Sequence, residues 1–333
     1  MAHHGEREDE GHDGGDDEKE HEPDPAAGIL PCLAHQPSKR EAGGGDPYVL
    51  HLDTVTYDGT LMAVIERIDD ASDPRLGDYQ NLRDPLLRLQ RGIFIAESRE
   101  VIRRLVACRR FRTRSIMVTP AALEGLRDLL DTLGPDVRIL LVDHDVVRRV
   151  VGFNFHRGCV AVGERGAELL PSTLVEPSGR RLLLVLEDVT NPDNVGAVFR
   201  NGSAFGANGV LLSPGCADPL YRKSIRVSIG SSLCLPFARL ANWPDDLRLL
   251  RKSGHAILAL TPRAHAIDIT EFGTKRPVPE RLALLVGAEG TGLSAAALDA
   301  ANYEVRIAMA PGADSLNVAT ACGIALHRLA ASS

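Results

Sequence analysis

The sequence lacks several features that define large classes of proteins. Only 4% of its 333 residues are aromatic, so its core must consist mainly of Leu, Val, Ala and Ile. The longest apolar runs, such as Leu282–Val286, are far shorter than the roughly 20 residues that a membrane-spanning helix needs. No basic segment followed by an apolar stretch opens the chain, so we expect neither a secretion signal nor an association with membranes.

Cysteines are few and scattered along the chain. None of the six forms a C-x-x-C pair, and their spacing matches no zinc site. We therefore expect neither a disulfide framework nor a structural zinc site, and the predicted location is the reducing cytoplasm.

Acidic charge is concentrated at one end of the chain. Residues 1–47 hold thirteen Asp or Glu and four Lys or Arg, a net charge of −9, whereas the remainder carries +2. The overall charge of −7 thus conceals a slightly basic body that can bind a polyanion. The tail combines low hydrophobicity with high charge, which predicts disorder, because burial of so little apolar surface cannot offset chain entropy.

Two α/β domains are expected after this tail. Residues 48–166 alternate apolar strands with amphipathic helices, the latter over residues 100–108 and 121–133, and residues 167–180 form a linker. Residues 181–333 contain apolar strands separated mostly by helices, which predicts a parallel sheet covered on both faces. The strands expected there are Leu182–Leu186, Gly209–Leu212, Ile257–Leu260, Leu282–Val286 and Tyr303–Ile307.

A polar segment beginning Asn-Pro-Asp-Asn follows the first of these strands. It leads into a helical stretch that places Arg200 within about two turns of Asn194. Ligands of open α/β sheets bind beyond the carboxyl ends of the strands. The segment from Glu187 to Asn194 is such an end, so its polar residues face a potential site. Asn194 can cap the helix. Taken alone, the segment fits an ordinary strand exit with a solvent-facing arginine equally well.

Two further segments follow later strands. In VGAEGTGLS, from Val286 to Ser294, the glycines allow a tight turn or close approach to a ligand, but their order is neither the dinucleotide fingerprint nor the P-loop. Glu289 in this segment would repel a phosphate. In the last segment, from Ile307 to Leu329, Ser315 or Asp314 can cap an amphipathic helix. Each segment alone is also explained by a structural turn or a capped helix.

Together, the three segments resemble the SpoU (TrmH-like) branch of the SPOUT RNA methyltransferases. The family's N-P-x-N-x-G-A-x-x-R motif matches residues 191–200, and its G-x-E-G-x-G-[LIM] motif matches residues 287–293. Its I-P-M and S-L-N-V elements match residues 307–318, with Ala308 in place of the usual proline, a change that removes no functional group. The resemblance covers the second domain strongly and the first more weakly.

The resemblance implies both a fold and an activity. SpoU enzymes transfer a methyl group from S-adenosylmethionine to a ribose 2′-hydroxyl in RNA, and a deep trefoil knot in their parallel-sheet domain holds the cofactor. We therefore expect an α/β protein with a knotted methyltransferase domain over residues 181–333, preceded by a small RNA-binding domain. The predicted cofactor-binding residues are Leu260, Thr261, Pro262, Gly287, Ile307 and Leu316.

Five residues match the catalytic positions of the family: Asn194, Arg200, Glu289, Ser315 and Asn317. A guanidinium stays protonated at neutral pH, so we expect Arg200 to bind the hydroxyl or an adjacent phosphate and to stabilise the developing alkoxide rather than act as the base. The two asparagines and the serine would orient these groups, and the glutamate would hold Arg200 or its own loop. No metal is needed, because the sulfonium is already an activated donor.

An arginine-rich stretch is the expected RNA-binding surface of the first domain. Eight arginines lie between residues 91 and 114 against two glutamates, and this excess favours an anionic partner over a merely solvated helix face. The RNA-binding candidates are Arg91, Arg99, Arg103, Arg110 and Arg222.

The resemblance also implies a cytoplasmic homodimer that acts on ribosomal RNA more readily than on transfer RNA, because a separate N-terminal domain is typical of the ribosomal-RNA enzymes. Four alternatives stay open at this point. They are a tRNA 2′-O-methyltransferase, a base methyltransferase, a non-catalytic RNA-binding protein that keeps the fold, and a nucleotide-dependent α/β enzyme that uses the glycine segment.

Overall fold

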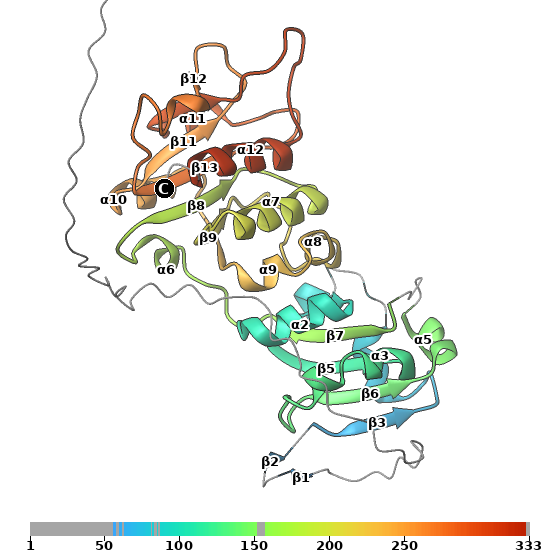
Figure 1. Ribbon diagram of the computed structural model, residues 1–333. Coiled ribbons are helices and arrows are strands. Elements are labelled where there is room, and N and C mark those ends of the chain that lie inside the picture. Colours follow the sequence, from blue (N-terminus) through green and yellow to red (C-terminus); the bar gives the residue numbers. More distant parts are fainter. Residues whose placement is uncertain are drawn as a thin grey trace, which may run out of the picture. The chain divides into compact units, whose positions relative to one another are not determined.

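The computed structural model describes residues 56–57, 60–61, 63–80, 82, 85, 87–151 and 157–330. The predicted acidic tail, residues 1–47, lies outside this part of the chain. The described residues form a five-stranded sheet, a seven-stranded sheet and a two-stranded ribbon (Figure 1). Every helix in the described residues is too short or too polar to span a membrane.

The five-stranded sheet is mixed. Its strands follow the order β3-β6-β5-β7-β4, with β7 antiparallel to β4 and β5 and the remaining pairs parallel. The helix expected over residues 121–133 is divided into two short helices, because the first ends at Gly125, a poor helix former. The bounds are β1 Thr56–Tyr57, β2 Thr60–Leu61, β3 Ile65–Ile68, η1 Pro74–Tyr79, η2 Leu87–Arg91, β4 Ile93–Glu97, α2 Arg99–Cys108, β5 Arg112–Val118, α3 Pro120–Glu124, α4 Arg127–Leu130, β6 Arg138–Val142, α5 His144–Val151 and β7 Cys159–Glu164.

The seven-stranded sheet is parallel throughout, which confirms the predicted fold class. Its order is β10-β9-β8-β13-β11-β14-β12. All five expected strands are present, each within one residue of its predicted ends, whereas the two outermost strands are too short for an apolar pattern to reveal. The strands are β8 Arg181–Leu186, β9 Gly209–Leu212, β10 Phe237–Arg239, β11 Ala256–Leu260, β12 Ile267–Asp268, β13 Arg281–Val286 and β14 Tyr303–Arg306.

Helices cover both faces of this sheet (Figure 1). Leu184 and Leu186 of β8 pack with α7 and α12, while Leu183 and Val185 pack with α6, α10 and α11. Alternate strand residues thus serve two separate cores, as expected for a buried parallel strand. The helices are α6 Ser172–Val175, α7 Pro192–Ala204, α8 Arg222–Val227, α9 Ser231–Cys234, α10 Leu247–Lys252, η3 Ile269–Glu271, α11 Ala295–Asp299 and α12 Val318–Ala330.

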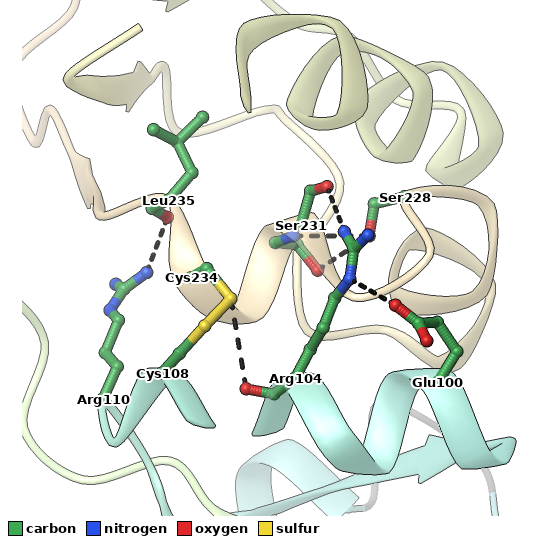
Figure 2. The surroundings of a disulfide bond; sticks show 9 residues. Glu100, Arg104, Cys108, Arg110, Ser228, Ser231, Cys234 and Leu235 are labelled. Carbon is green, nitrogen blue, oxygen red and sulfur yellow. Dashed lines mark hydrogen bonds and ion pairs between the residues drawn. A yellow bond between two sulfur atoms is a disulfide. The ribbon is translucent and has the colours of Figure 1, made fainter. Parts of the chain in front are cut away.

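A disulfide contradicts the expectation drawn from cysteine spacing. Cys108 at the end of α2 is bonded to Cys234 at the end of α9, with their Cα atoms 5.3 Å apart (Figure 2). Beside this bond, Nη1 of Arg104 in α2 donates to Oγ of Ser231 in α9 at 3.1 Å. Spacing could not reveal the pair, because the cysteines are 126 positions apart and meet only where α2 packs against α9.

We expect this disulfide to stabilise the folded chain by about 2–4 kcal/mol, because it restricts the unfolded chain by closing a long loop. Urea denaturation should give a lower free energy of unfolding for the reduced protein and for the double variant C108S/C234S. The double variant should no longer respond to reductant, whereas C159S, which changes a free buried cysteine, should respond as the wild type does. Equal stability of the oxidised and reduced wild-type protein would contradict the prediction.

Candidate active site

Segments at the carboxyl ends of the parallel strands enclose one pocket. The ends of β8, β9 and β13 lie level, because Leu186 pairs with Val286 on one side and with Leu212 on the other. A pocket of about 340 Å³ is lined by the segments that follow β11, β13 and β14 and by the start of α12. All six residues predicted to bind the cofactor line it: Leu260, Thr261, Pro262, Gly287, Ile307 and Leu316.

The glycine-rich segment folds back on itself beside this pocket. The N–H of Gly292 donates to the carbonyl oxygen of Ala288 at 3.0 Å, and a Cβ on Gly287 would lie 2.4 Å from the carbonyl carbon of Gly292. Gly290 and Gly292 have φ angles of +91° and +68°, in the left-handed region that favours glycine. The glycines therefore shape a tight loop, called the glycine loop below (residues 287–293), whose backbone forms part of the pocket wall.

One side chain connects all three motifs. Asn194 in α7 is 8% exposed; its Nδ2 donates to Oε1 of Glu289, and its Oδ1 accepts from Nδ2 of Asn317 at 3.0 Å. Glu289 therefore holds Asn194 and not Arg200. Glu289, Ser315 and Asn317 also line the pocket, so four of the five predicted catalytic residues lie in or beside it.

Both predicted helix caps are wrong. α7 is capped by Asn191, whose Oδ1 accepts from the backbone N–H two residues later at 2.9 Å, so Asn194 lies inside the helix. Asparagine followed by proline is a favoured start for a helix, which explains the earlier boundary. α12 is capped by Asn317, whose Oδ1 accepts from the second and third N–H groups after it, and not by Ser315 or Asp314.

Comparison with known proteins agrees with this arrangement. The sequence model of the SpoU rRNA Methylase family matches residues 181–327. An uncharacterised tRNA/rRNA methyltransferase of Mycobacterium bovis is 40% identical over 267 residues, which cover 79% of this chain and 91% of the relative. This chain belongs to the SpoU family of RNA methyltransferases.

Other SpoU relatives are more distant. The 23S rRNA (guanosine-2′-O-)-methyltransferase RlmB of Ralstonia nicotianae is 31% identical over 192 residues, which cover 57% of this chain and 75% of the relative. The crystal structure of the SpoU methyltransferase AviRb from Streptomyces viridochromogenes in complex with the cofactor AdoMet is similar with a TM-score of 0.65 and 25% identity. It covers 78% of this chain and 97% of AviRb.

The SpoU motif arginine stands apart from the pocket of its own chain. Arg200 is an exposed residue of α7 and is not among those that line the pocket. Within the part of the chain that the structure describes, its guanidinium makes no hydrogen bond or ion pair. The structure therefore brings together every predicted catalytic residue except the cation.

A second, more open groove lies between α7 and α12. Its volume is about 640 Å³, and both Asn194 and Asn317 line it as well. Asn201 bridges the helices by donating from Nδ2 to the carbonyl oxygen of Ala319 at 2.7 Å. Ile324 of α12 lines the same groove and is 41% exposed.

The predicted RNA-binding arginines all have partners within the chain. Arg103 forms two hydrogen bonds of 2.7 Å with the carboxylate of Asp128, and Arg222 lies 2.6 Å from the carboxylate of Glu97. The others donate to backbone carbonyl oxygens, Arg91 to Gly77 at 2.9 Å, Arg99 to Ala121 at 3.3 Å and Arg110 to Leu235 at 2.8 Å. Acidic residues distant in sequence thus offset much of the local positive charge, and an RNA-binding role for these arginines stays a prediction.

Several residues that line the pocket were missing from the predicted set. Four of them, Gly290, Gly292, Met309 and Val318, are positions of the SpoU motifs, so the same motifs would have located them. The others are Val286 and Ala288, which flank Gly287, and Ala321, which lies one helical turn after Asn317.

Proposed function

We propose that this protein binds S-adenosylmethionine in the pocket and methylates a ribose 2′-hydroxyl in RNA, with ribosomal RNA as its substrate. The observation that carries the proposal is the convergence of three motifs, far apart in the chain, on one pocket through the side chain of Asn194. The 31% identity to RlmB supports the ribosomal substrate and the 2′-oxygen as acceptor.

The pocket residues suit this cofactor. A volume of about 340 Å³ is within the usual range for a small ligand, roughly 300–1,000 Å³. Leu260, Ile307 and Leu316 offer apolar contacts for a purine, and the glycine loop offers backbone groups. The carboxylate of Glu289 disfavours phosphates and suits a sulfonium cation, which argues against the nucleotide-dependent alternative.

The chain's own residues would assemble the acceptor side of the site. When bound, the cofactor supplies an activated methyl group. Asn194 fixes Glu289 and Asn317 relative to each other, so that the pocket mouth presents a rigid polar edge to the RNA. Arg200 would bind the ribose hydroxyl or a neighbouring phosphate and stabilise the negative charge that develops on the 2′-oxygen.

A homodimer would bring the missing cation to the site. Arg200 is exposed and unpaired among the described residues, while the groove between α7 and α12 adjoins the pocket and carries exposed Ile324. We propose that this groove is the dimer interface and that Arg200 of one protomer acts at the pocket of its partner. The proposal also includes the trefoil knot in residues 181–333 and a cytoplasmic location.

Methylation of defined RNAs tests the function. The protein is incubated with tritiated S-adenosylmethionine and, separately, with ribosomal RNA and transfer RNA from a strain that lacks the gene. We expect label in ribosomal RNA, at one nucleotide whose phosphodiester resists alkaline cleavage as a 2′-O-methyl group requires. Label in transfer RNA alone would overturn the proposal that ribosomal RNA is the substrate. Label at an alkali-sensitive position would indicate methylation of a base. RNA and cofactor binding without any transfer would support the non-catalytic alternative.

A further inference from the structure

A buried carboxylate outside the three motifs lies beside the cofactor pocket. Glu187 directly follows β8 and is 4% exposed. Its backbone N–H donates to the carbonyl oxygen of Val286 at 2.9 Å, and Val286 and Gly287 both line the pocket. The residue is therefore adjacent to the pocket wall without being part of it.

The carboxylate of Glu187 holds the far end of the glycine loop. Its Oε2 accepts from the backbone N–H of Ser294 at 2.9 Å, and its Oε1 accepts from Nε1 of Trp243 at 2.5 Å. Ser294 immediately follows the glycine loop and caps α11. One end of the loop is thus fixed by β13 and the other by Glu187, so the backbone wall of the pocket depends on this side chain.

Both partners of Glu187 are hydrogen-bond donors, and only a carboxylate can accept from both. A glutamine would place an NH₂ group against one of them. Among the residues that the structure describes, no lysine, arginine or histidine lies within ion-pair distance of Glu187 or of Glu289. Two carboxylates of the described chain therefore lie at the glycine loop with no cation of that same part of the chain paired to them.

We propose that Glu187 is a positioning residue for the cofactor, and that its charge makes the pocket prefer a sulfonium cation to the neutral thioether product. This inference rests on the proposed function. Methyl transfer breaks the S–CH₃ bond, leaves its electron pair on sulfur and forms a C–O bond at the 2′-oxygen, whose proton passes to water. S-adenosylmethionine thus carries one more positive charge than S-adenosylhomocysteine, and a nearby buried anion attracts only the former. The pocket favours exchange of spent product for fresh cofactor.

Binding of the two cofactor forms to full-length protein, measured by calorimetry, tests this inference. We expect E187Q to lower the affinity for S-adenosylmethionine about tenfold more than the affinity for S-adenosylhomocysteine, because the substitution removes the charge but keeps the side-chain size. E187D keeps the charge but shortens the reach to Ser294. It should therefore lower the affinity for both ligands and leave the ratio of the two affinities near the wild-type value. W243F removes one hydrogen bond to the same carboxylate and should also lower the affinity for both ligands by the same factor.

Each outcome has one meaning. Equal weakening of both ligands by E187Q would show that Glu187 only shapes the loop, and would overturn the role of its charge. Unchanged affinities in E187D and W243F would overturn the positioning role, even if E187Q did not fold. If the wild-type protein bound neither ligand, the proposed function would be overturned instead, because that function requires the binding of S-adenosylmethionine.

Discussion

Replacing Gly287 with alanine should weaken the binding of S-adenosylmethionine at least 100-fold. The new Cβ would lie 2.4 Å from the carbonyl carbon of Gly292 and 2.6 Å from the backbone nitrogen of Leu293. Both are backbone atoms of the glycine loop, which Glu187 holds at its far end and Asn194 holds through Glu289, so relief requires the pocket wall to move. Calorimetry measures the loss, and circular dichroism checks that the variant is folded.

Gly290→Ala is the matched control for this variant. Gly290 belongs to the same loop, but a Cβ there meets nothing within 4 Å, so only its φ of +91° resists the substitution. We expect a loss of affinity of about tenfold, in keeping with the roughly 1–2 kcal/mol that this backbone region costs a residue with a side chain. Equal effects of the two substitutions would show that close packing at Gly287 is unimportant.

Replacing Arg200 with alanine should lower kcat for RNA methylation by about 10²–10³, the usual effect of removing one group that stabilises a developing oxyanion. The affinity for S-adenosylmethionine should change less than about twofold, because Arg200 does not line the pocket of its own chain. Single-turnover methylation and calorimetry measure the two quantities. R328A, which changes an arginine in the last turn of α12, serves as a control for a general loss of positive charge.

Mixing the two inactive variants decides which protomer uses Arg200. If Arg200 acts at the partner's pocket, a mixed dimer of R200A and G287A has one complete site, formed by the intact pocket of the first and the intact arginine of the second. Random exchange of subunits should then restore about a quarter of the wild-type activity. A mixture that stays inactive although mixed dimers form would place Arg200 in its own protomer's site.

The sequence was most informative where a local pattern determines a local structure. The apolar runs located β8, β9, β11, β13 and β14 within one residue, because a strand buried on both faces needs continuous apolar residues. The motif match located two of the segments that line the pocket, residues 287–293 and 307–318, for a similar reason, since the carboxyl ends of neighbouring parallel strands meet at one edge of the sheet.

Predictions were weaker wherever the structure depends on a distant part of the chain. Arg103 is paired with Asp128, which lies outside the arginine-rich stretch, and Arg222 is paired with Glu97, which is 125 positions away, so no local count of charges reveals either pair. The disulfide was missed for the same reason. Glu187 was recognisable only as the first residue of a polar strand end, because its two hydrogen-bond partners, Trp243 and Ser294, are distant in sequence.

The hydrogen bonds of Asn194 also determine when the pocket can be completed during synthesis of the chain. Its two partners lie 95 and 123 residues further along the chain, so the polar edge of the pocket cannot form until Asn317 has left the ribosome. A nascent chain that already displays its N-terminal sheet has no finished pocket. Translation order thus delays completion of the pocket until α12 emerges, and a truncated product that ends before Asn317 would lack this polar edge.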